Sequence, residues 1–353
     1  PRIDVSCTMT FHGNDFVLEI GGKTLRDEAA VDAALSGKVA LCRVKREATS
    51  TVALAAFATS MTYLRSKGTH RLEDKWGALL LREEYALRHG YAHWMWFGAL
   101  NATDVAAPPS CHEVTSSVAL GHVLKTLTVL AVLVACDGCD SVVYADVDSF
   151  PVQPNVKIES YIALAPSAHL IMSSQSGKPI VMNSGLFILR NCLWSRNFLA
   201  EWWSRRCGEK DQLALWETLF ADWSQRAPSL LADPNLFRNY SYAHQNALPT
   251  LVSVRVATWP ALSFEQWRCA PGTLCSKVLT ASRCFAEPTL LPRVLVLPVA
   301  EFSDGQGGAL PPMQSAGKLG LFCHKHCARG YNGSTYTAGC VGRLKELNFK
   351  PAV

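Results

Sequence analysis

The residues that could carry chemistry begin with a pair of carboxylates, Asp146 and Asp148, which follow the apolar run at residues 141–145. Such a run suits a strand buried on both faces, and ligands of open α/β sheets bind beyond the carboxyl ends of the strands. Mg²⁺ and Mn²⁺ prefer carboxylate oxygens and in turn neutralise a diphosphate. The pair therefore predicts a site for a divalent cation and a diphosphate. The alternative is two solvated aspartates in a turn.

Two further polar segments come later in the chain. Asn183, Ser184 and Gly185 lead directly into an apolar run; an asparagine amide can bind hydroxyls, and glycine lets a ligand approach the backbone. Asp211 and Gln212 open a helical stretch, where an aspartate is first of all expected to cap the helix. Each segment alone is explained as well by an ordinary turn or cap.

Strands and helices that alternate along the chain must position these residues. We predict strands at 39–44, 92–97 and 141–145, separated by helices at 76–88 and 118–135. Trp76, Leu79, Leu80 and Leu87 define the apolar face of the first helix. The later half adds strands at 170–172, 185–189 and 294–297 and Trp-rich helices at 194–203 and 212–220. This alternation indicates an α/β sheet with nucleotide-binding topology.

In this order the segments resemble the metal-dependent GT-A glycosyltransferases. Most similar is the retaining Golgi family of yeast α-galactosyl- and α-mannosyltransferases and plant xyloglucan xylosyltransferases. Four motifs carry the resemblance: Y-x-x-x-H-G-Y at 85–91, a lysine at Lys125 in the helix before the D-x-D, N-[TS]-G-x-F-x-[IL]-R-N-x-x-W-S at 183–195, and D-Q-x-A-[LI] at 211–215. The resemblance covers roughly residues 38–330. It implies an α/β, Rossmann-like GT-A fold with a mixed central sheet.

The resemblance also implies a division of the chain and an activity. Residues 1–37 are expected to form an N-terminal extension, and 38–353 a catalytic domain with a nucleotide-sugar half (38–150) and an acceptor half (151–353). The implied reaction moves a galactose- or xylose-like sugar from a UDP-sugar to a glycan or glycoprotein, with retention of configuration. It needs Mn²⁺ or Mg²⁺.

Residue roles follow from the same resemblance. The nucleotide would lie at Val44 and Lys45. The diphosphate and the sugar would lie near Lys125, Ser184 and Gly185. The anomeric carbon would lie near Asp211 or Gln212, and Asn183 and Asp211 would bind sugar hydroxyls. Asp146, Asp148 and a late histidine would hold the metal. Both His324 and His326 are candidates, because the usual H-F-x-G-C spacing is not reproduced. A Cys/His zinc site with Cys136 and Cys139, or disulfides, are the competing interpretations of this cysteine-rich region.

Composition excludes several classes of protein. Of 353 residues, 49% are hydrophobic and 18% charged, which is too apolar for a disordered chain. The net charge of +5 is spread along the chain, so no nucleic-acid partner is expected. Thirteen cysteines and sequons at Asn101, Asn239 and Asn332 favour a glycosylating, oxidising compartment, the Golgi lumen in particular. Because the chain opens at Pro1 without a signal or spanning segment, we expect a membrane anchor to precede it in the natural protein.

Two other functions compete with sugar transfer. A catalytically inactive sugar- or nucleotide-binding protein could use the same residues. A D-x-D phosphohydrolase would place its acidic pair after the first strand and continue it as D-x-D-G-[TV], whereas Ser149 and Phe150 follow here.

Overall fold

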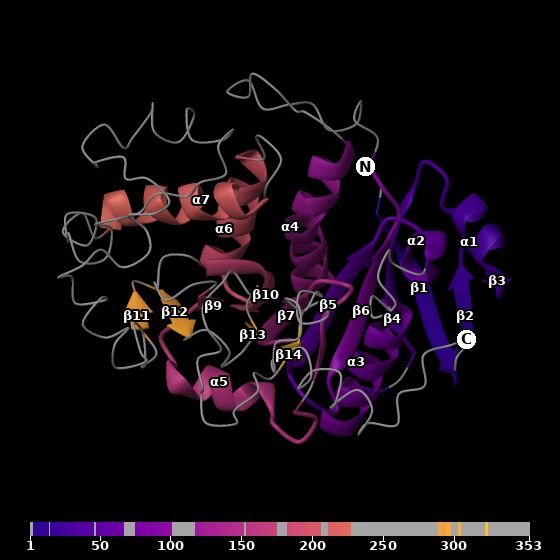
Figure 1. Cartoon of the computed structure of the whole chain (residues 1–353), viewed down its shortest axis with the longest axis horizontal. Helices are drawn as coiled ribbons and strands as arrows, with labels where there is room; N and C mark the ends of the chain where they lie inside the picture. Colours follow the sequence, from indigo (N-terminus) through magenta and orange to yellow (C-terminus); the bar gives the residue numbers. More distant parts are fainter. Residues whose placement is uncertain are drawn as a thin grey trace, which may run out of the picture.

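The computed structural model describes residues 3–13, 15–45, 47–66, 75–100, 117–151, 153–174, 182–205, 211–226, 289–291, 293–297, 303–304 and 322–323. Within these ranges the chain forms an 11-stranded sheet with helices on both faces, and a 3-stranded sheet beside it (Figure 1). The predicted fold class, α/β with a mixed central sheet, is confirmed.

The bounds of the elements are as follows. The strands of the large sheet are β1 (Ile3–His12), β2 (Asp15–Ile20), β3 (Lys23–Leu25), β4 (Val39–Val44), β5 (Val52–Ala58), β6 (Ala92–Phe97), β7 (Ser141–Ala145), β9 (Leu170–Ser174), β10 (Met182–Arg190), β11 (Thr289–Leu291) and β12 (Val294–Leu297). The small sheet contains β8 (Phe150–Pro151), β13 (Ser303–Asp304) and β14 (Phe322–Cys323). The helices are α1 (Glu28–Ala34), α2 (Met61–Arg65), α3 (Lys75–His89), α4 (Ser117–Ala135), α5 (Ile158–Leu164), α6 (Leu193–Ser204) and α7 (Asp211–Arg226).

The large sheet has the strand order β11-β12-β9-β10-β7-β5-β6-β4-β1-β2-β3. At its centre β7, β5 and β6 run parallel, so their carboxyl ends meet at one edge. On one side of this trio β10 runs antiparallel to β7, and on the other β4 runs antiparallel to β6. The residue after β7 is Asp146, which places the D-x-D pair at the carboxyl edge of the parallel trio.

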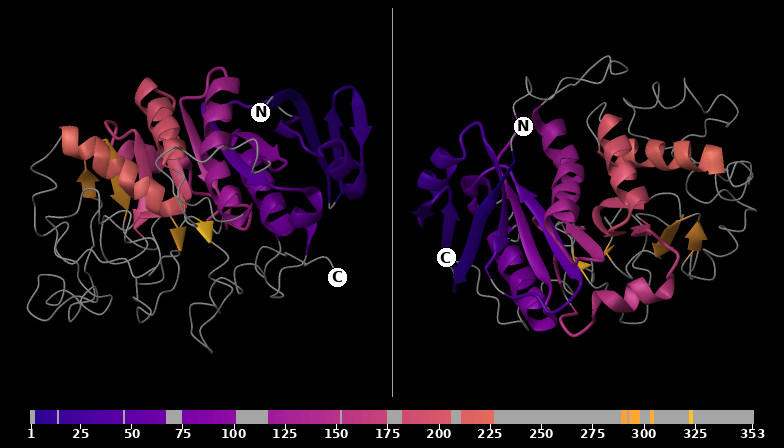
Figure 2. Two further views of the ribbon diagram at one scale, coloured as in Figure 1. Left: turned by 90° about the horizontal axis from the view of Figure 1, so that it is seen from above. Right: turned by 180° about the vertical axis from the view of Figure 1, so that it is seen from behind.

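Helices cover both faces of the sheet. Two views of the ribbon show α4, α6 and α7 over one face and α3 and α5 over the other (Figure 2). Residues of the first three helices pack against side chains such as Tyr144 and Phe187, and residues of α3 and α5 pack against Val143 and Ile188. The central strands are buried on both faces, as their near-continuous apolar sequences predict. Among the described residues, no helix is long and apolar enough to cross a membrane.

The first strands extend the same sheet at its far edge. β1 runs parallel to β4, and β2 and β3 follow as an antiparallel meander. Cys7 and Cys42 stand opposite each other in the β1–β4 ladder and form a disulfide. The predicted N-terminal extension, residues 1–37, thus contributes edge strands to the central sheet.

One element was not predicted and one expectation was wrong. Residues 52–58 were not among the predicted strands, yet they form β5, which lies beside β7 at the centre of the sheet. The apolar face expected on the first helix included Leu87, which is 66% exposed. The buried face of α3 instead follows Trp76, Leu79, Arg82 and Tyr85, at the three-residue spacing of one helix face, and includes a fully buried arginine.

Candidate functional site

A buried lysine joins the segments singled out from the sequence. Lys125 on α4 places its Nζ 2.9 Å from Oδ2 of Asp211 at the start of α7, and 3.4 Å from Oδ1 of Asp146 after β7. The same Nζ donates to the carbonyl oxygen of Ser184 on β10, at 3.1 Å. Two helices and two strands therefore converge on one ammonium group, at the carboxyl end of β7.

Lys125 remains a cation despite its burial. Burial by itself lowers the pKa of a lysine, but the nearby carboxylates of Asp146 and Asp211 outweigh this effect, so that the pKa of Lys125 is raised. The neighbouring Tyr144 donates its hydroxyl to Oδ1 of Asp146 at 2.8 Å. Burial and the carboxylate of Asp146 raise the pKa of Tyr144 well above its usual range, which keeps the hydroxyl protonated as a donor.

The carboxylate of Asp211 faces Lys125 and Ser184. Besides Lys125, its Oδ2 accepts a hydrogen bond from Oγ of Ser184 at 2.5 Å. Its main-chain oxygen accepts from the indole of Trp202 at 2.9 Å, which fixes the first turn of α7 against α6. The carboxylate is therefore engaged by groups from α4 and β10. This arrangement differs from the simple helix cap that its position in the sequence suggests.

The segment Asn183-Ser184-Gly185 lies beside the D-x-D turn because β10 pairs with β7. Leu186 is the register partner of Ala145, and the amide of Asp146 donates to the carbonyl of Gly185 at 2.8 Å. The side-chain oxygen of Asn183 accepts from the amide of Gly185 at 2.6 Å. Since that oxygen serves the backbone, the side-chain N–H groups of Asn183 are the ones suited to bind a ligand hydroxyl.

The donor set at the D-x-D turn fits a magnesium- or manganese-type cation. Asp146 and Asp148 follow β7 in a turn closed by the amide of Ser149, which donates to the carbonyl of Asp146 at 2.8 Å. Both provide oxygen ligands, the type that hard divalent cations prefer. In the part of the chain that the structure describes, no group of three His, Cys, Asp or Glu residues could hold a metal ion. Two carboxylates with substrate phosphates would nevertheless complete such a site.

Some predicted site residues lie elsewhere or outside the described residues. Val44 and Lys45 end β4, which is antiparallel to β6, so they lie toward the opposite edge of the sheet from Asp146. Lys45 is exposed and pairs with Glu19 instead. The strand that ends beside β7 is β5. Gln212 belongs to α7, but its side chain is outside the described residues, as are His324 and His326.

Sequence reasoning missed three residues of this region. His122 precedes Lys125 by three residues on α4, and its Nδ1 lies 3.8 Å from Oδ1 of Asp211. The three-residue spacing from Lys125 is the signal that could have found it. Tyr144 could have been found from its position two residues before Asp146, on the same side of the strand. The third is Arg82, which the apolar pattern of α3 gave no reason to place inside.

Parts of two motifs that carried the family resemblance serve the scaffold. In the Y-x-x-x-H-G-Y segment, Tyr85 donates to the carbonyl of Val156 at 2.6 Å and Tyr91 to Glu159 at 2.6 Å, which ties α3 and β6 to α5 and the loop before it. Burial raises the pKa of both tyrosines above the usual range. These residues are thus structural.

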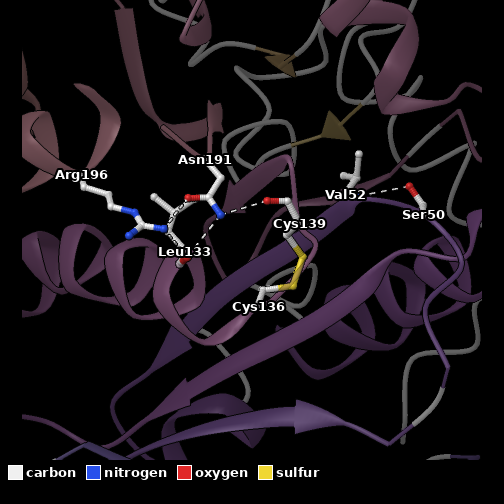
Figure 3. Close-up of a disulfide and its surroundings, with 7 residues drawn as sticks. All are labelled: Ser50, Val52, Leu133, Cys136, Cys139, Asn191 and Arg196. Atoms are coloured by element: carbon white, nitrogen blue, oxygen red, sulfur yellow. Dashed lines mark hydrogen bonds between the residues drawn. A yellow bond between two sulfur atoms is a disulfide. The ribbon is translucent and has the colours of Figure 1, made fainter. Parts of the chain in front are cut away.

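Asn191, in the second such motif, holds the base of α4. Its Nδ2 donates to the carbonyls of Leu133 and Cys139, at 3.3 and 3.0 Å, and its Oδ1 accepts from Arg196 (Figure 3). Cys136 and Cys139 form a disulfide with each other across the turn from α4 to β7. Of the two interpretations of these cysteines, the structure has the disulfide and not the zinc site. The disulfide anchors the two elements that carry Lys125 and Asp146.

The tryptophans of α6 belong to the core. Trp202 is fully buried and Trp194 nearly so, stacked on Phe198 with ring centroids 4.9 Å apart. Trp203 is partly buried against the same core. The core interpretation of this Trp-rich helix therefore applies to Trp194 and Trp202, and neither ring is available to stack on a sugar.

Comparisons with known proteins give similarity to solved structures only. No family model matches the sequence, and no curated protein matches it significantly. Among solved structures, the chain is similar to a glycosyltransferase involved in the glycosylation of the major capsid of PBCV-1. The identity is 12%, the TM-score is 0.39, and the match covers 83% of this chain and 98% of that one. A function for this chain therefore has to be argued from the site itself.

Proposed function

We propose that this protein is a metal-dependent retaining glycosyltransferase of the GT-A type. It would transfer a galactose- or xylose-like sugar from a UDP-sugar to a glycan or glycoprotein. The observation that carries the proposal is the convergence of Lys125, Asp146, Ser184 and Asp211 at the carboxyl end of β7. Ligands of α/β sheets bind at this edge, and the cluster contains the groups that a diphosphate-linked sugar requires.

Each group of the cluster has a task in such a reaction. Asp146 and Asp148 would hold Mn²⁺ or Mg²⁺, which supplies Lewis-acid stabilisation of the leaving diphosphate when bound. Lys125 adds a buried positive charge, and buried charges act more strongly than exposed ones on a nearby transition state. Asp211 carries the negative charge suited to a developing positive anomeric carbon, and Ser184 orients its carboxylate. Asn183 would bind a sugar hydroxyl through its amide nitrogen.

The nucleotide would lie at the end of β5 rather than of β4. β5 is parallel to β7 and adjacent to it, so its end at Ala58 shares the edge with Asp146. We therefore expect the nucleotide to contact the residues that follow Ala58, and not Val44 and Lys45.

The compartment and acceptor are part of the same proposal. Disulfides at Cys7–Cys42 and Cys136–Cys139 support an oxidising secretory compartment such as the Golgi lumen, since cytosolic proteins rarely keep such bonds. Glycans and glycoproteins are the acceptors found there. One of His324 and His326 would complete the metal site.

The test measures release of UDP from UDP-galactose, UDP-xylose and UDP-glucose, with Mn²⁺ and with excess EDTA. We expect UDP release that EDTA abolishes and that Asp148→Asn reduces at least ~10²-fold. Asp140→Asn is the matched control, since this exposed aspartate precedes β7 at the opposite edge of the sheet. It should behave as wild type.

The outcomes separate the competing functions. UDP-sugar binding with Mn²⁺ but no release of UDP by wild type, with or without a mixture of glycan acceptors, would indicate an inactive binding protein. Hydrolysis of a simple phosphomonoester, together with no binding of any UDP-sugar, would indicate a phosphohydrolase. Full activity in EDTA would contradict metal dependence.

A further inference from the structure

A buried arginine on α3 donates hydrogen bonds to the main chain of the D-x-D segment. Arg82 on α3 is 1% exposed. Its Nη1 donates to the carbonyl oxygens of Ala145 at 2.9 Å and Asp146 at 3.1 Å, and its Nη2 lies 3.4 Å from the carbonyl oxygen of Val147. Three consecutive carbonyls therefore meet one guanidinium group.

These three carbonyls lie where β7 ends and the D-x-D turn begins. β7 ends at Ala145, and the amide of Asp146 makes a main-chain bond to Gly185. Beyond that point the chain leaves the ladder, and the turn has one main-chain bond of its own, from the amide of Ser149 to the carbonyl of Asp146. The guanidinium of Arg82 adds a donor to each of the three carbonyls, which helps to hold the turn in one conformation after the strand has ended.

Burial of the guanidinium charge of Arg82 costs solvation free energy, which its contacts with the turn must offset. Desolvation lowers the pKa of Arg82 to about 10, although the nearby Tyr144, Asp148 and Asp146 act in the opposite direction. The side chain therefore stays charged at neutral pH. An apolar residue would pack the interior of α3 at lower cost, because a buried ion is often less stabilising than a hydrophobic residue of similar size. Only arginine offers a rigid planar fork that reaches several carbonyls at once.

We infer that Arg82 is a positioning residue for the metal and diphosphate site. By holding the carbonyls of residues 145–147, it sets the direction in which Asp146 and Asp148 leave the backbone. This inference rests on the proposed function, because it concerns the same turn. Arg82 touches main-chain atoms and would act on the ligand only through the two aspartates.

Charge and geometry make opposite predictions for a substitution. A positive charge near Asp146 and Asp148 repels a cation, so if charge were the main effect, removing Arg82 would tighten metal binding. If geometry is the main effect, binding weakens, and it weakens even when the charge is kept. Arg82→Lys keeps the charge and loses the fork, whereas Arg82→Met removes both.

The experiment measures the dissociation constant of Mn²⁺ in the presence of UDP, by calorimetry and by the electron paramagnetic resonance signal of free Mn²⁺. Lys75→Met is the matched control, because Lys75 is a buried cation on the same helix that donates to the carbonyl of Tyr63, away from the turn. Thermal unfolding of every variant is recorded in parallel. If Arg82→Met does not fold, the comparison of Arg82→Lys with Lys75→Met remains.

We expect Arg82→Lys to weaken Mn²⁺ binding by ~10- to 100-fold, the usual effect of residues that orient metal ligands. Lys75→Met should lower the melting temperature and leave the dissociation constant unchanged. Wild-type affinity in Arg82→Lys, or tighter binding in Arg82→Met, would overturn the positioning role while leaving the proposed function intact. If wild type itself binds no Mn²⁺ with UDP, the proposed function fails and this inference fails with it.

Discussion

The ammonium group of Lys125 lies 2.9 Å from the carboxylate of Asp211, and the two side chains come from different helices on one face of the sheet. Lys125 also lies 3.4 Å from Asp146, the first residue after β7. One buried cation is thus shared by two carboxylates, of which we propose that Asp146 binds the metal ion and Asp211 faces the sugar.

Replacing Asp211 by asparagine should reduce catalysis more than binding. The substitution keeps the volume of the side chain but removes the negative charge that faces Lys125 and accepts from Ser184. We expect kcat to fall at least ~10²-fold, with UDP affinity little changed, because a charge that acts in the transition state has been lost. Steady-state kinetics with a UDP-sugar should show kcat and kcat/KM falling together.

The control for this variant is Asp222→Asn, on the same helix. Asp222 contacts the indole of Trp194 at 3.5 Å, in a different part of the core. It should keep wild-type kcat. If Asp211→Asn also keeps wild-type kcat, Asp211 serves the structure of α7 only.

Removing the shared cation should destabilise the fold, and removing one of its partners should relieve part of that loss. Lys125→Met leaves the buried carboxylate of Asp211 without its cation, and breaking such a pair costs about 3 kcal/mol or more in the free energy of unfolding. In the double variant Lys125→Met with Asp211→Asn, only the partly exposed carboxylate of Asp146 has lost its cation, so the loss should be smaller than the sum of the single losses by about 1–3 kcal/mol. Urea denaturation of the four proteins measures this coupling; strictly additive losses would contradict the shared-cation arrangement.

The two disulfides should differ in their effect on stability. Cys7–Cys42 closes a separation of 35 residues, whereas Cys136–Cys139 closes one of 3. In the chain-entropy account, the longer loop contributes about 4 kcal/mol and the shorter about 2 kcal/mol. Replacing each pair by alanines and measuring urea unfolding should therefore give the larger loss for Cys7 and Cys42. An equal or reversed order would show that packing around the sulfurs, rather than the unfolded chain, decides the difference.

Acidification should weaken the fold at His169. Burial, together with the positive charges of Arg293 and Arg190, lowers the pKa of this imidazole below its usual 6.5. The folded protein then binds the proton less well than the unfolded chain, so the stability present above pH 6.5 is lost as the pH falls below it. His169→Gln should make the decline in unfolding free energy between about pH 7 and about pH 5 shallower. His12→Gln, at an exposed position, is the control; equal slopes in wild type and His169→Gln would exclude this contribution.

Much of the secondary structure was predictable from the sequence because its signals are local. The predicted strands at 39–44, 92–97, 141–145 and 294–297 agree with β4, β6, β7 and β12. β5 was missed because its sequence, VALAAFA, is rich in alanine and contains a single β-branched residue. Alanine favours helices and gives no strand signal, and only the burial of β5 between β6 and β7 makes it a strand.

The candidate site was also predictable only in part. Residue types and order along the chain were sufficient to select Lys125, Asp146, Ser184 and Asp211, because each follows an apolar run, leads into one or lies on a helix. Strand direction was not available from the sequence: a short apolar run reads the same whether its neighbour is parallel or antiparallel. This is why Val44 and Lys45 were placed with the nucleotide although β4 runs the other way.

The sequence by itself determined which chemical groups the protein has and which elements carry them, because periodicity and strand ends are properties of short segments. Only the tertiary structure decided that Lys125 serves two carboxylates and that Arg82 lies inside, bonded to the carbonyls of the D-x-D turn. The physical reason is the cost of burying a charge. That cost is met only when distant segments supply partners at the right distance, and such distances are set by the packing of the whole sheet with its helices.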